Sequence, residues 1–454
     1  MNQFSELVNK QQQFFKRNHT KSIAFRIEQL KKLKHVIQSH ETLLNDAIKK
    51  DFHKSEFDTY SNELGLIYHD INEAIKKVKR WSRIKRVRTN LVNFPAKSYI
   101  IPEPLGVSLV IGAWNYPYQL SFAPVVAAMA AGCTIILKPS ELPIHTSQIM
   151  QQIVRDNFSE DYFAVVEGGI EETTALLKQR FDKIFFTGST KVGRIVYEAA
   201  AKNLTPVTLE LGGKSPVFVT ESCNLKMTAR RLVWAKFLNA GQTCIAPDYA
   251  IVHEKIHDQF LEAVVTEIKK SDYKLSNNNY VQIINQRNFD RLTKLIQSEQ
   301  VYFGGTCHPE DRTIEPTILK GIRFEDPIMQ EEIFGPILPV IAYKNIQDAI
   351  DYVKSGEKPL SCYIYSSNRK EIKQVLNEVS FGGGCVNESI MHITNSKLPF
   401  GGVGASGIGS YHGEAGFNTF SHFKSILDKP TWFELSLKYS PLTKRKLDFV
   451  KKLL

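Results

Sequence analysis

Apolar residues recur every three or four positions through the first eighty residues of the chain, over about 3–17, 22–52 and 59–80. This spacing puts them on one face of an α-helix, so it predicts three long amphipathic helices. Helices of this kind bury their apolar face, and covering a sheet is a common way to do so. The segment 90–101 lacks the helical period and is rich in residues that favour strands, which predicts a strand or an extended arm.

From Val107 onward the pattern changes to short β-branched runs separated by helix-like stretches. Alternation of this kind is typical of a doubly wound parallel sheet. A second alternation after residue 225 predicts another such unit, so the fold class is α/β with two doubly wound domains. The predicted strands are 107–112, 133–138, 163–166, 182–186, 207–209, 215–219, 248–253, 335–342, 361–366 and 383–387, with helices at 225–239 and 254–270.

The most apolar stretch, from Leu120 to Leu137, contains Pro124 and Gly132. It predicts a buried helix that runs into a strand rather than a membrane span. Six cysteines lack paired spacing and any CxxC motif, so neither a disulfide framework nor a metal site is expected. Residues 1–6 lack the basic-then-apolar layout of a signal peptide, and a reducing cytoplasm is the expected location. The cysteines are Cys133, Cys223, Cys244, Cys307, Cys362 and Cys385.

The net charge of +11 is concentrated in residues 1–100 and 424–454. Lysines of the first region are interleaved with Leu and Ile at helical spacing, which predicts a solvated helix face rather than a nucleic-acid site. The tail is different, because apolar and basic residues from Ser440 onward alternate as on an amphipathic helix. Such a helix either packs on the protein's own surface, which is the favoured interpretation, or lies on an anionic membrane surface. The tail residues concerned are Leu447, Val450, Leu453 and Leu454 on one face and Lys444, Lys446, Lys451 and Lys452 on the other.

Candidate chemistry centres on Cys244, which lies among small and polar residues between Gly241 and Pro247. A thiolate on a constrained, reachable loop is a strong nucleophile, although a single cysteine is often only a small buried apolar residue. Glu210 ends an apolar strand, where burial raises the pKa of a carboxyl toward that of a general base. A buried glutamate with satisfied hydrogen bonds is the alternative. The amide of Asn115 follows another strand and can donate to an oxyanion or simply tie a turn.

Segment 182–193 runs from a strand through Gly188 into a helix, without the usual dinucleotide fingerprint. Ser189 and Thr190 offer a helix cap and free backbone N–H groups to a phosphate, but such a turn can also be purely structural. Two glycine-rich loops, 330–336 and 398–407, lie beside acidic and aromatic residues. Taken singly they indicate only tight turns.

Together these motifs resemble those of the aldehyde dehydrogenase superfamily, in that family's order and over nearly the whole chain. The motifs are Phe-Thr-Gly-Ser-Thr-Lys-Val-Gly (186–193), Leu-Glu-Leu-Gly-Gly-Lys-Ser-Pro (209–216), Gly-Gln-Thr-Cys (241–244), Glu-Glu-Ile-Phe-Gly-Pro (331–336) and Pro-Phe-Gly-Gly-Val-Gly-Ala-Ser-Gly (399–407). Trp-Asn-Tyr-Pro (114–117) and the segment 411–422 are similar to the class 3 branch, which includes oxidisers of fatty and aromatic aldehydes. The resemblance implies an NAD-dependent enzyme, with NADP use possible, and a homodimer built by a β-arm for oligomerisation.

The resemblance also implies roles for individual residues. Cys244 would attack the aldehyde, the Asn115 amide would hold the oxyanion, and Glu210 would activate the water that hydrolyses the thioester. Six residues would contact the cofactor: Lys138 and Glu141 the adenine ribose, Gly188 and Ser189 the pyrophosphate, Glu332 the nicotinamide ribose, and Phe334 the nicotinamide ring. No metal is implied, since the histidines show no ligand spacing.

The expected domain division is 1–207 for the NAD(P)-binding domain, with an arm at about 82–101, and 208–400 for the catalytic domain. Residues 401–454 would return to the cofactor domain and add a strand for oligomerisation and the tail. Three alternatives stay open from the sequence. An acylating dehydrogenase would pass the thioester to coenzyme A, a thiol hydrolase would work without cofactor but would want a histidine partner, and a binding protein would need none of the reactive groups.

Overall fold

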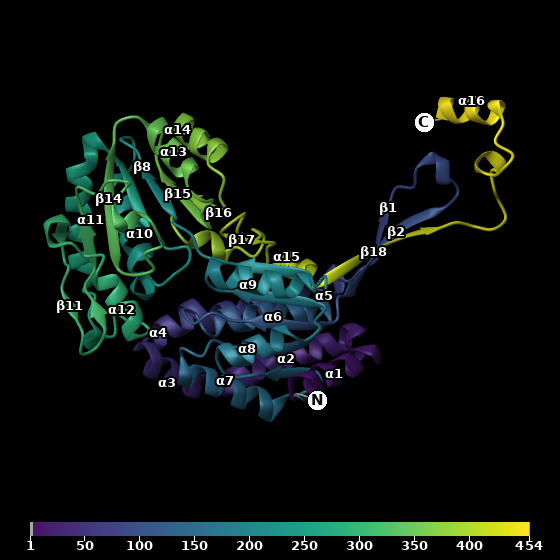
Figure 1. Ribbon diagram of the computed structural model, residues 1–454, viewed down its shortest axis with the longest axis horizontal. Helices are drawn as coiled ribbons and strands as arrows, with labels where there is room; N and C mark the ends of the chain where they lie inside the picture. Colours follow the sequence, from purple (N-terminus) through teal and green to yellow (C-terminus); the bar gives the residue numbers. More distant parts are fainter. Residues whose placement is uncertain (1–2, 454) are drawn as a thin grey trace.

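The computed structural model describes residues 3–453, which form two lobes and a projecting arm (Figure 1). The first lobe is built on a six-stranded sheet in the order β17-β7-β6-β3-β4-β5, parallel except for β17. Its central strand β3 is followed along the chain by β4 and β5 on one side and by β6 and β7 on the other. The strands are β3 Val107–Ile111, β4 Thr134–Lys138, β5 Phe163–Val165, β6 Lys183–Thr187, β7 Val207–Glu210 and β17 Gly407–Ile408.

Helices cover both faces of this sheet because successive strand residues point to opposite sides. Val110 and Phe185 belong to one core, whereas their neighbours Leu109, Ile184 and Phe186 belong to the other. The first core is closed by α2 Ile23–Ser39, α3 Glu41–Phe52, α5 Gly65–Trp81, α6 Gln119–Ala131, α7 Ile144–Asn157 and α15 Gly413–Thr419. The second core is closed by α1 Gln3–Lys16, α8 Ile170–Leu177 and α9 Thr190–Ala201.

The second lobe contains a seven-stranded sheet in the order β10-β13-β14-β9-β8-β15-β16. All neighbours are parallel except the edge pair β10 and β13. Helices α10 Leu225–Phe237 and α11 His257–Ser271 pack on one face, and α12 Gln286–Thr293, α13 Ile346–Ser355 and α14 Arg369–Glu378 pack on the other. The strands are β8 Pro216–Val219, β9 Tyr249–His253, β10 Val301–Phe303, β13 Thr317–Leu319, β14 Ile337–Tyr343, β15 Ser361–Tyr365 and β16 Gly383–Val386, and a small ribbon pairs β11 Cys307–His308 with β12 Thr313–Ile314.

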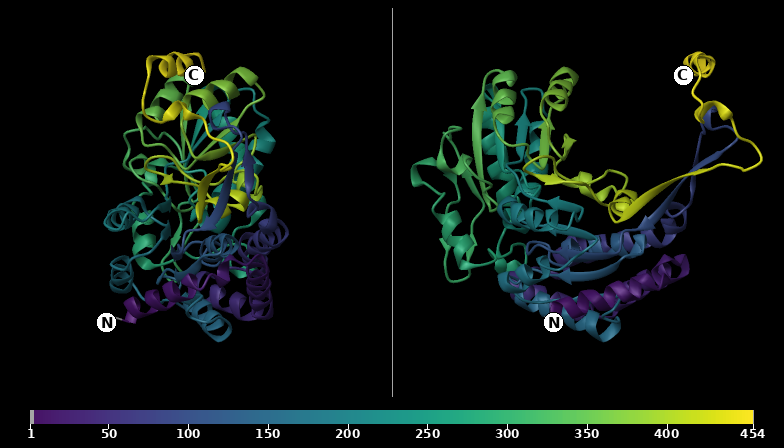
Figure 2. Two further views of the ribbon diagram at one scale, coloured as in Figure 1. Left: turned by 90° about the vertical axis from the view of Figure 1, so that its right-hand side faces the viewer. Right: turned by 45° about the vertical axis from the view of Figure 1, so that its right-hand side comes forward.

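The arm is a three-stranded antiparallel sheet that extends away from both lobes (Figure 2). Its strands are β1 Lys85–Val87, β2 Lys97–Pro104 and β18 Ser421–Asp428. Strand β18 pairs with β2 along its full length, so the end of the chain returns to residues about 320 positions earlier. The tail continues past β18 to α16 Lys444–Leu453, which lies at the far end of the arm (Figure 1).

The predicted α/β class with two doubly wound sheets is confirmed, and the predicted strands match within a residue or two. Helix α6 is buried on every side and leads into β4, as the apolar stretch 120–137 predicted. No helix among residues 3–453 is both long enough and apolar enough to cross a membrane. The chain passes from the first sheet to the second between β7 and β8. The domain bounds proposed from the sequence stay a prediction.

Two expectations near the N-terminus were wrong in detail. The helix predicted over 22–52 is two helices, because His40 leaves the helical conformation (φ −117°, ψ 15°) and α3 begins at the next residue. A one-residue break hardly disturbs the apolar period, so the pattern cannot reveal it. The extended segment predicted over 90–101 contains a 3₁₀ turn at Leu91–Asn93, and its strand begins only at Lys97.

Candidate active site

The Cys244 loop begins with a sharp reversal at the end of α10. Asn239, Ala240 and Gly241 all have left-handed backbone conformations, with φ of 53°, 51° and 72°. Gly241 is required here for a second reason, because a Cβ atom on it would lie 2.2 Å from the carbonyl oxygen of Gly335. The reversal therefore packs the Cys244 loop directly on the loop that carries Glu332.

Asn115 is fixed to the Cys244 loop by hydrogen bonds at both its side chain and its backbone. Its amide nitrogen donates to the carbonyl of Gln242 at 3.1 Å, two residues before Cys244. Its own carbonyl accepts from Asn239 Nδ2 at 3.0 Å and from Lys54 Nζ at 3.0 Å. The second hydrogen of the Asn115 amide has no acceptor among the described residues. This geometry holds a neutral donor beside the thiol, as oxyanion stabilisation requires.

Glu210 lies at the carboxyl end of β7 and is 3% exposed. Neither carboxylate oxygen has a hydrogen-bond partner among residues 3–453. Burial without a partner favours the neutral acid, and it raises the pKa of Glu210 well above its usual range. The alternative of a structural glutamate with satisfied hydrogen bonds does not fit this environment. An unpartnered carboxyl with a raised pKa is suited to exchange a proton with a water molecule.

The same surroundings keep Cys244 in its thiol form. Burial raises its pKa to about 12, and the nearby carboxyl groups of Glu332 and Glu210 act in the same direction. The backbone N–H groups of Cys244 and Ile245 favour the thiolate but are outweighed. The side chain is half-buried and packs against the core of the first lobe. Two carboxyls and a thiol therefore share one poorly solvated site, so a positive charge placed there would lower the pKa of the thiol.

Glu332 and Phe334 reach this site from the second lobe. The Glu332 carboxylate lies against Gly212, where an added Cβ atom would be only 2.0 Å from Glu332 Oε2. The N–H of Gly213 donates to the same carboxylate. Burial and the charge of Asp248 raise the pKa of Glu332 to about 8. Phe334 has a left-handed backbone (φ 52°), and its ring packs edge-on against Trp114, next to Asn115, with 5.3 Å between centroids.

Two charged residues that the sequence reasoning missed hold this junction together. Lys214 Nζ donates to Asp248 at 2.6 Å and to the carbonyls of Ile328 and Glu331 at 2.9 and 3.0 Å. The other oxygen of Asp248 accepts the N–H of Ile333 at 3.0 Å. Lys214 lies within the motif 209–216, directly after its Gly-Gly pair, and Asp248 directly follows Pro247, four residues after Cys244. Nothing in the sequence pairs them, because their contact depends on how three loops meet.

The cofactor candidates of the first lobe lie at the carboxyl edge of its parallel sheet, where doubly wound folds bind nucleotides. Ser189 caps α9 by accepting the Val192 N–H at 3.4 Å, which leaves the first backbone N–H groups of the helix to an anion. Gly188 would let a pyrophosphate come close to the backbone but would not donate to it, because its N–H already donates to the carbonyl of Glu210 at 3.0 Å. Strands β3 and β6 are neighbours, but the chain continues from β3 to β4 on one side and from β6 to β7 on the other, so the turn lies at the topological switch point.

Lys138 and Glu141 lie farther along the same edge, at the end of β4. Lys138 is buried and donates to the carbonyl of Pro139 at 2.7 Å, whereas Glu141 is exposed. Burial lowers the pKa of Lys138, and the carboxylates of Glu141, Glu172 and Glu167 partly offset this effect. The region thus combines one ammonium with three carboxylates. Such a set suits the hydroxyl groups of a ribose better than an additional phosphate.

A cleft of about 950 Å³ separates the start of α9 from the second lobe. It is bounded by Gly212–Lys214 and by the segments 329–332 and 355–359, and Arg194 on α9 lines it. Its volume is at the upper end for ligand sites, and it joins a helix N-terminus to Glu332. The residues present therefore fit a dinucleotide. No group of three or more His, Cys, Asp or Glu side chains among residues 3–453 is placed to hold a metal ion.

The structure thus brings Cys244, Asn115, Glu210, Glu332 and Phe334 to one place. Gly188 and Ser189 lie next to them along the sheet edge, and Lys138 and Glu141 lie two strands away from β6. The other catalytic arrangement considered from the sequence, a thiol with a histidine partner, is not found at Cys244 within residues 3–453. Among the described residues the cysteine that contacts an imidazole is Cys385, whose Sγ lies 3.5 Å from His392 Nδ1.

Comparison with known proteins agrees with this geometry. The sequence model of the aldehyde dehydrogenase family matches residues 2–426. The 4,4′-diaponeurosporen-aldehyde dehydrogenase of Staphylococcus aureus is 45% identical over 442 residues, with 96% of each chain covered. Aldehyde dehydrogenase family 3 member A2 of Rattus norvegicus is 43% identical, covering 98% of this chain and 93% of its own. The dimeric NADP-preferring aldehyde dehydrogenase of Canis lupus familiaris is 42% identical, covering 96% and 97%.

Among solved structures, the substrate-bound state of Staphylococcus aureus AldH superimposes with a TM-score of 0.97. It is 44% identical and covers 100% of this chain and 99% of its own. The match includes the arm and the tail, which lies beyond the end of the family match at residue 426. These comparisons confirm the resemblance and the fold inferred from the motifs.

Proposed function

Because the chain belongs to the aldehyde dehydrogenase family, we propose that Cys244, Asn115 and Glu210 are the groups with which it oxidises an aldehyde to a carboxylic acid. The chain is an oxidoreductase that acts on aldehydes with NAD or NADP. The observation that carries the assignment is the buried meeting of a thiol, an unpartnered carboxyl and an amide tied to the thiol's loop.

In the first step, the Cys244 thiol gives up its proton to solvent water, and its sulfur attacks the carbonyl carbon of the aldehyde and forms a thiohemiacetal. Negative charge develops on the carbonyl oxygen, and the free amide hydrogen of Asn115 and the Cys244 N–H are the available donors. The hydrogen bond from Asn115 to Gln242 fixes the amide before substrate arrives. The donor therefore needs no reorganisation when the oxyanion forms.

Bound NAD or NADP supplies the hydride acceptor. Five side chains or turns of this chain would hold it, from the adenine end at Lys138 and Glu141, through the Gly188–Ser189 turn, to Glu332 and Phe334. The Phe334 ring packs against Trp114, and the Glu332 carboxylate accepts a hydrogen bond from the N–H of Gly213. Trp114 directly precedes Asn115, so the contact between the Trp114 and Phe334 rings links the residue that faces the cofactor to the residue that donates to the oxyanion.

Glu210 then takes a proton from water, and the resulting hydroxide attacks the thioester to release the acid. The raised pKa of Glu210 makes its ionised form a stronger base than an exposed glutamate, so proton transfer from water to that form is easier. The presence of this base favours hydrolysis over transfer to coenzyme A. A cofactor-independent hydrolase is disfavoured because Cys244 has no hydrogen-bonded histidine among the described residues.

Glu210→Gln tests the order of these steps. Gln keeps the shape of the side chain but cannot take a proton, so we expect a burst of reduced cofactor followed by turnover slowed by about 10²-fold or more. Stopped-flow absorbance of the reduced nicotinamide measures both phases. Cys244→Ala is the control and should abolish both. If Glu210→Gln loses the burst itself, Glu210 acts before hydride transfer and the assignment is wrong.

For the cofactor we propose that NAD is preferred and that NADP is also used. The exposed carboxylate of Glu141 accepts a hydrogen bond from a ribose hydroxyl and repels a 2′-phosphate. A dimeric relative is named as NADP-preferring, which supports tolerance of both forms in this family.

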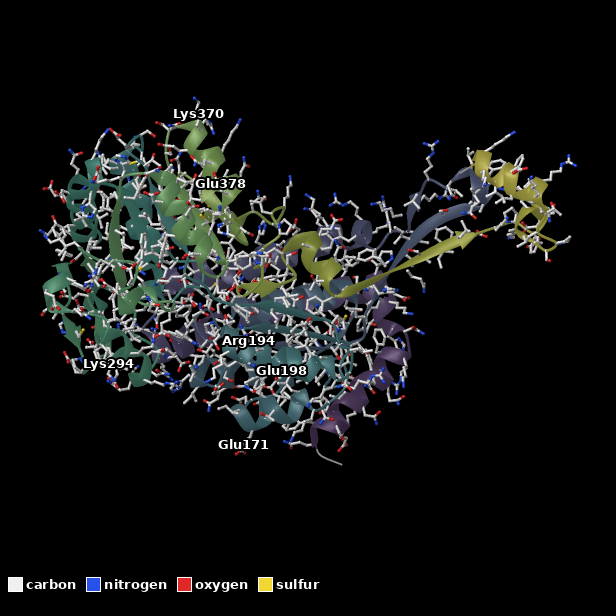
Figure 3. The ribbon with its side chains drawn as sticks, turned by 45° about the horizontal axis from the view of Figure 1, so that its top comes forward. Glu171, Arg194, Glu198, Lys294, Lys370 and Glu378 are labelled. Atoms are coloured by element: carbon white, nitrogen blue, oxygen red, sulfur yellow. The ribbon has the colours of Figure 1, made fainter. Side chains whose placement is uncertain are left out.

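Glu141→Gln should therefore narrow the ratio of kcat/KM for NAD over NADP by about tenfold, since one repulsive charge is removed near the phosphate. Steady-state kinetics with both cofactors at one ionic strength measure the ratio. Glu171→Gln, on a helix of the same lobe, is a matched control that should leave the ratio unchanged (Figure 3). An unchanged ratio in Glu141→Gln would remove this residue from the cofactor site.

The substrates we propose are medium- or long-chain aliphatic aldehydes or aromatic aldehydes. The proposal is supported by the class 3 motifs and by the 45% identical relative that is named for 4,4′-diaponeurosporen-aldehyde. A panel of aldehydes of graded chain length would define the range. The enzyme is proposed to work in the cytoplasm, where its free cysteines would stay reduced.

A homodimer is proposed from the arm. Strand β18 is an edge strand of eight residues, and its side away from β2 is unpaired among the described residues. Large apolar side chains along the arm and tail are exposed, including Leu91, Phe94 and Trp432 at 79%, 66% and 77%. A relative 42% identical is named as dimeric. Pairing of the arm with a second copy would cover both the open edge and these side chains.

Light scattering at micromolar concentration should give twice the chain mass of 51.6 kDa. Replacing Val92 and Phe94, both exposed on the arm, by Asp should shift the protein toward the monomer without unfolding it, because neither residue is part of the core. A monomeric mass for the unaltered protein would contradict the proposal.

The tail is proposed to touch anionic membrane surfaces. Among residues 3–453, helix α16 lies at the far end of the arm and away from both lobes of its own chain, and Leu447 and Phe449 are each 52% exposed (Figure 1). Lysines flank these residues on the same short helix, as on helices that lie in a membrane interface. Leu454, which completed the predicted apolar face, lies outside the described residues.

Co-sedimentation with vesicles that contain phosphatidylserine should therefore show weak binding that falls as salt rises. Truncation after Tyr439 should abolish binding and leave the turnover of a water-soluble aldehyde intact. Phosphatidylcholine vesicles provide the control surface. Equal binding by full-length and truncated protein, or none by either, would mean that the tail has no membrane role.

A further inference from the structure

A buried ion pair outside the reacting groups connects the helical layer of the first lobe to the Asn115 turn. Lys54 follows α3, and Glu63 lies in a π-helical turn at Tyr60–Leu64. Their side chains are 2% and 0% exposed, and Lys54 Nζ lies 2.8 Å from Glu63 Oε1. Ionised side chains are rarely buried so completely unless each is paired and hydrogen-bonded.

Each member of the pair also binds the backbone near Asn115. Lys54 Nζ donates to the Asn115 carbonyl at 3.0 Å. Glu63 Oε2 accepts the N–H groups of Tyr118 and Gln119 at 2.7 and 3.3 Å. The pair thus holds both ends of the turn that leads from Asn115 into α6. A displacement of Lys54 or Glu63 would therefore shift the backbone of the turn and, with it, the Asn115 side-chain amide.

The Lys54–Glu63 pair is also connected to the Cys244 loop, in two ways. The Lys54 ammonium lies over the Tyr116 ring at 4.5 Å, and the Tyr116 hydroxyl is hydrogen-bonded to Thr243 Oγ1 at 2.6 Å. The Asn115 carbonyl that Lys54 binds is shared with Asn239 Nδ2. Lys54 is therefore linked to two residues of the Cys244 loop, to Thr243 through Tyr116 and to Asn239 through the Asn115 carbonyl.

Stability alone does not account for this arrangement. Removing two charges from water costs about as much as their attraction returns, so a buried ion pair is weak evidence for a stabilising role. What distinguishes this ion pair is that it holds three backbone groups of the Asn115 turn in place at once, namely one carbonyl and two N–H groups. Catalysis is sensitive to such positioning, since a shift of about 1 Å in a reacting group can cost about 10²-fold in rate.

We propose that Lys54 and Glu63 are positioning residues that set the Asn115 amide for oxyanion stabilisation at Cys244. The inference rests on the proposed role of Asn115, and it assigns the pair an effect on the first chemical step rather than on cofactor binding. The step itself is unchanged: the S–H bond of Cys244 breaks and its proton passes to solvent water, sulfur bonds to the carbonyl carbon, and the carbonyl π pair becomes the oxyanion that Asn115 holds.

The test compares Glu63→Gln and the double variant Lys54→Met/Glu63→Gln with the unaltered enzyme. The double variant leaves no unpaired buried charge, whereas Glu63→Gln alone leaves the Lys54 ammonium without its carboxylate. In both variants the oxygen of the introduced amide can still accept from the Tyr118 N–H. We expect the rate constant of the burst of reduced cofactor to fall by about 10- to 100-fold in the double variant. The dissociation constant for NAD, measured by fluorescence quenching, should stay within about twofold, because no cofactor contact is removed.

Lys183→Met is the matched control. Lys183 is also a buried lysine, 4% exposed, but its ammonium donates to Thr208 Oγ1 at 2.8 Å and makes no bond to the Asn115 turn. Its replacement should change the melting temperature without slowing the burst. If the control slows the burst as much as the double variant does, the effect is general destabilisation and the inference is wrong.

Epistasis separates a positioning role from a structural one. In an Asn115→Ala background, the double variant should slow the burst by less than about twofold further, since the group it positions is already absent. An undiminished loss in that background, or an unaltered burst in Glu63→Gln and the double variant, would overturn the inference. If Asn115→Ala alone leaves the burst unchanged, the fault lies in the proposed role of Asn115 instead.

Discussion

The hydrogen bonds of Asn115 are the constraint on which the site depends. The residue belongs to the first lobe, yet its amide bonds to Gln242 and its carbonyl binds Asn239, both in the Cys244 loop. A carbonyl with two donors and an amide with one acceptor leave little freedom to rotate or shift. The lobes can therefore build their sheets independently and still meet at a defined distance between the thiol and the donor.

Three left-handed residues before Cys244 make this meeting possible. They turn the chain back on itself at the end of α10, and in the buried loop that follows the carbonyl of Gln242 accepts the Asn115 amide. Gly241 also admits the backbone of Gly335, so the loop that carries Glu332 approaches without a side chain between. Lys214 and Asp248 close the same junction from the other side. Backbone contacts between these loops restrict the positions of the side chains they carry more than a mobile loop would.

Electrostatically the site is built of groups that resist ionisation. Burial raises the pKa of Cys244 and of Glu210, and it raises that of Glu332 to about 8. Charging any one of them makes it harder to charge the next, because the carboxyls and the thiol interact in a poorly solvated space. Reactivity therefore depends on what enters the site. A positive charge that entered the site would favour the thiolate of Cys244.

Much of this protein was determined by its sequence alone. Alternating apolar runs predicted both sheets, and the motifs around Gly188, Glu210, Cys244 and Glu332 indicated a family and a set of candidate residues. These signals are local, since they depend on side-chain period and on short loops with demanding backbone geometry. The break at His40 was invisible because one residue hardly changes the period.

Tertiary structure decided which of these residues meet. The Lys54–Glu63 pair, the Lys214–Asp248 pair and the contact between Gly241 and Gly335 join segments distant in sequence, and no local pattern records them. The same holds for the state of Glu210 and Cys244, because a pKa depends on burial and on neighbouring charges rather than on the residue itself. Sequence specified the groups, and packing of the two lobes set their distances and their protonation.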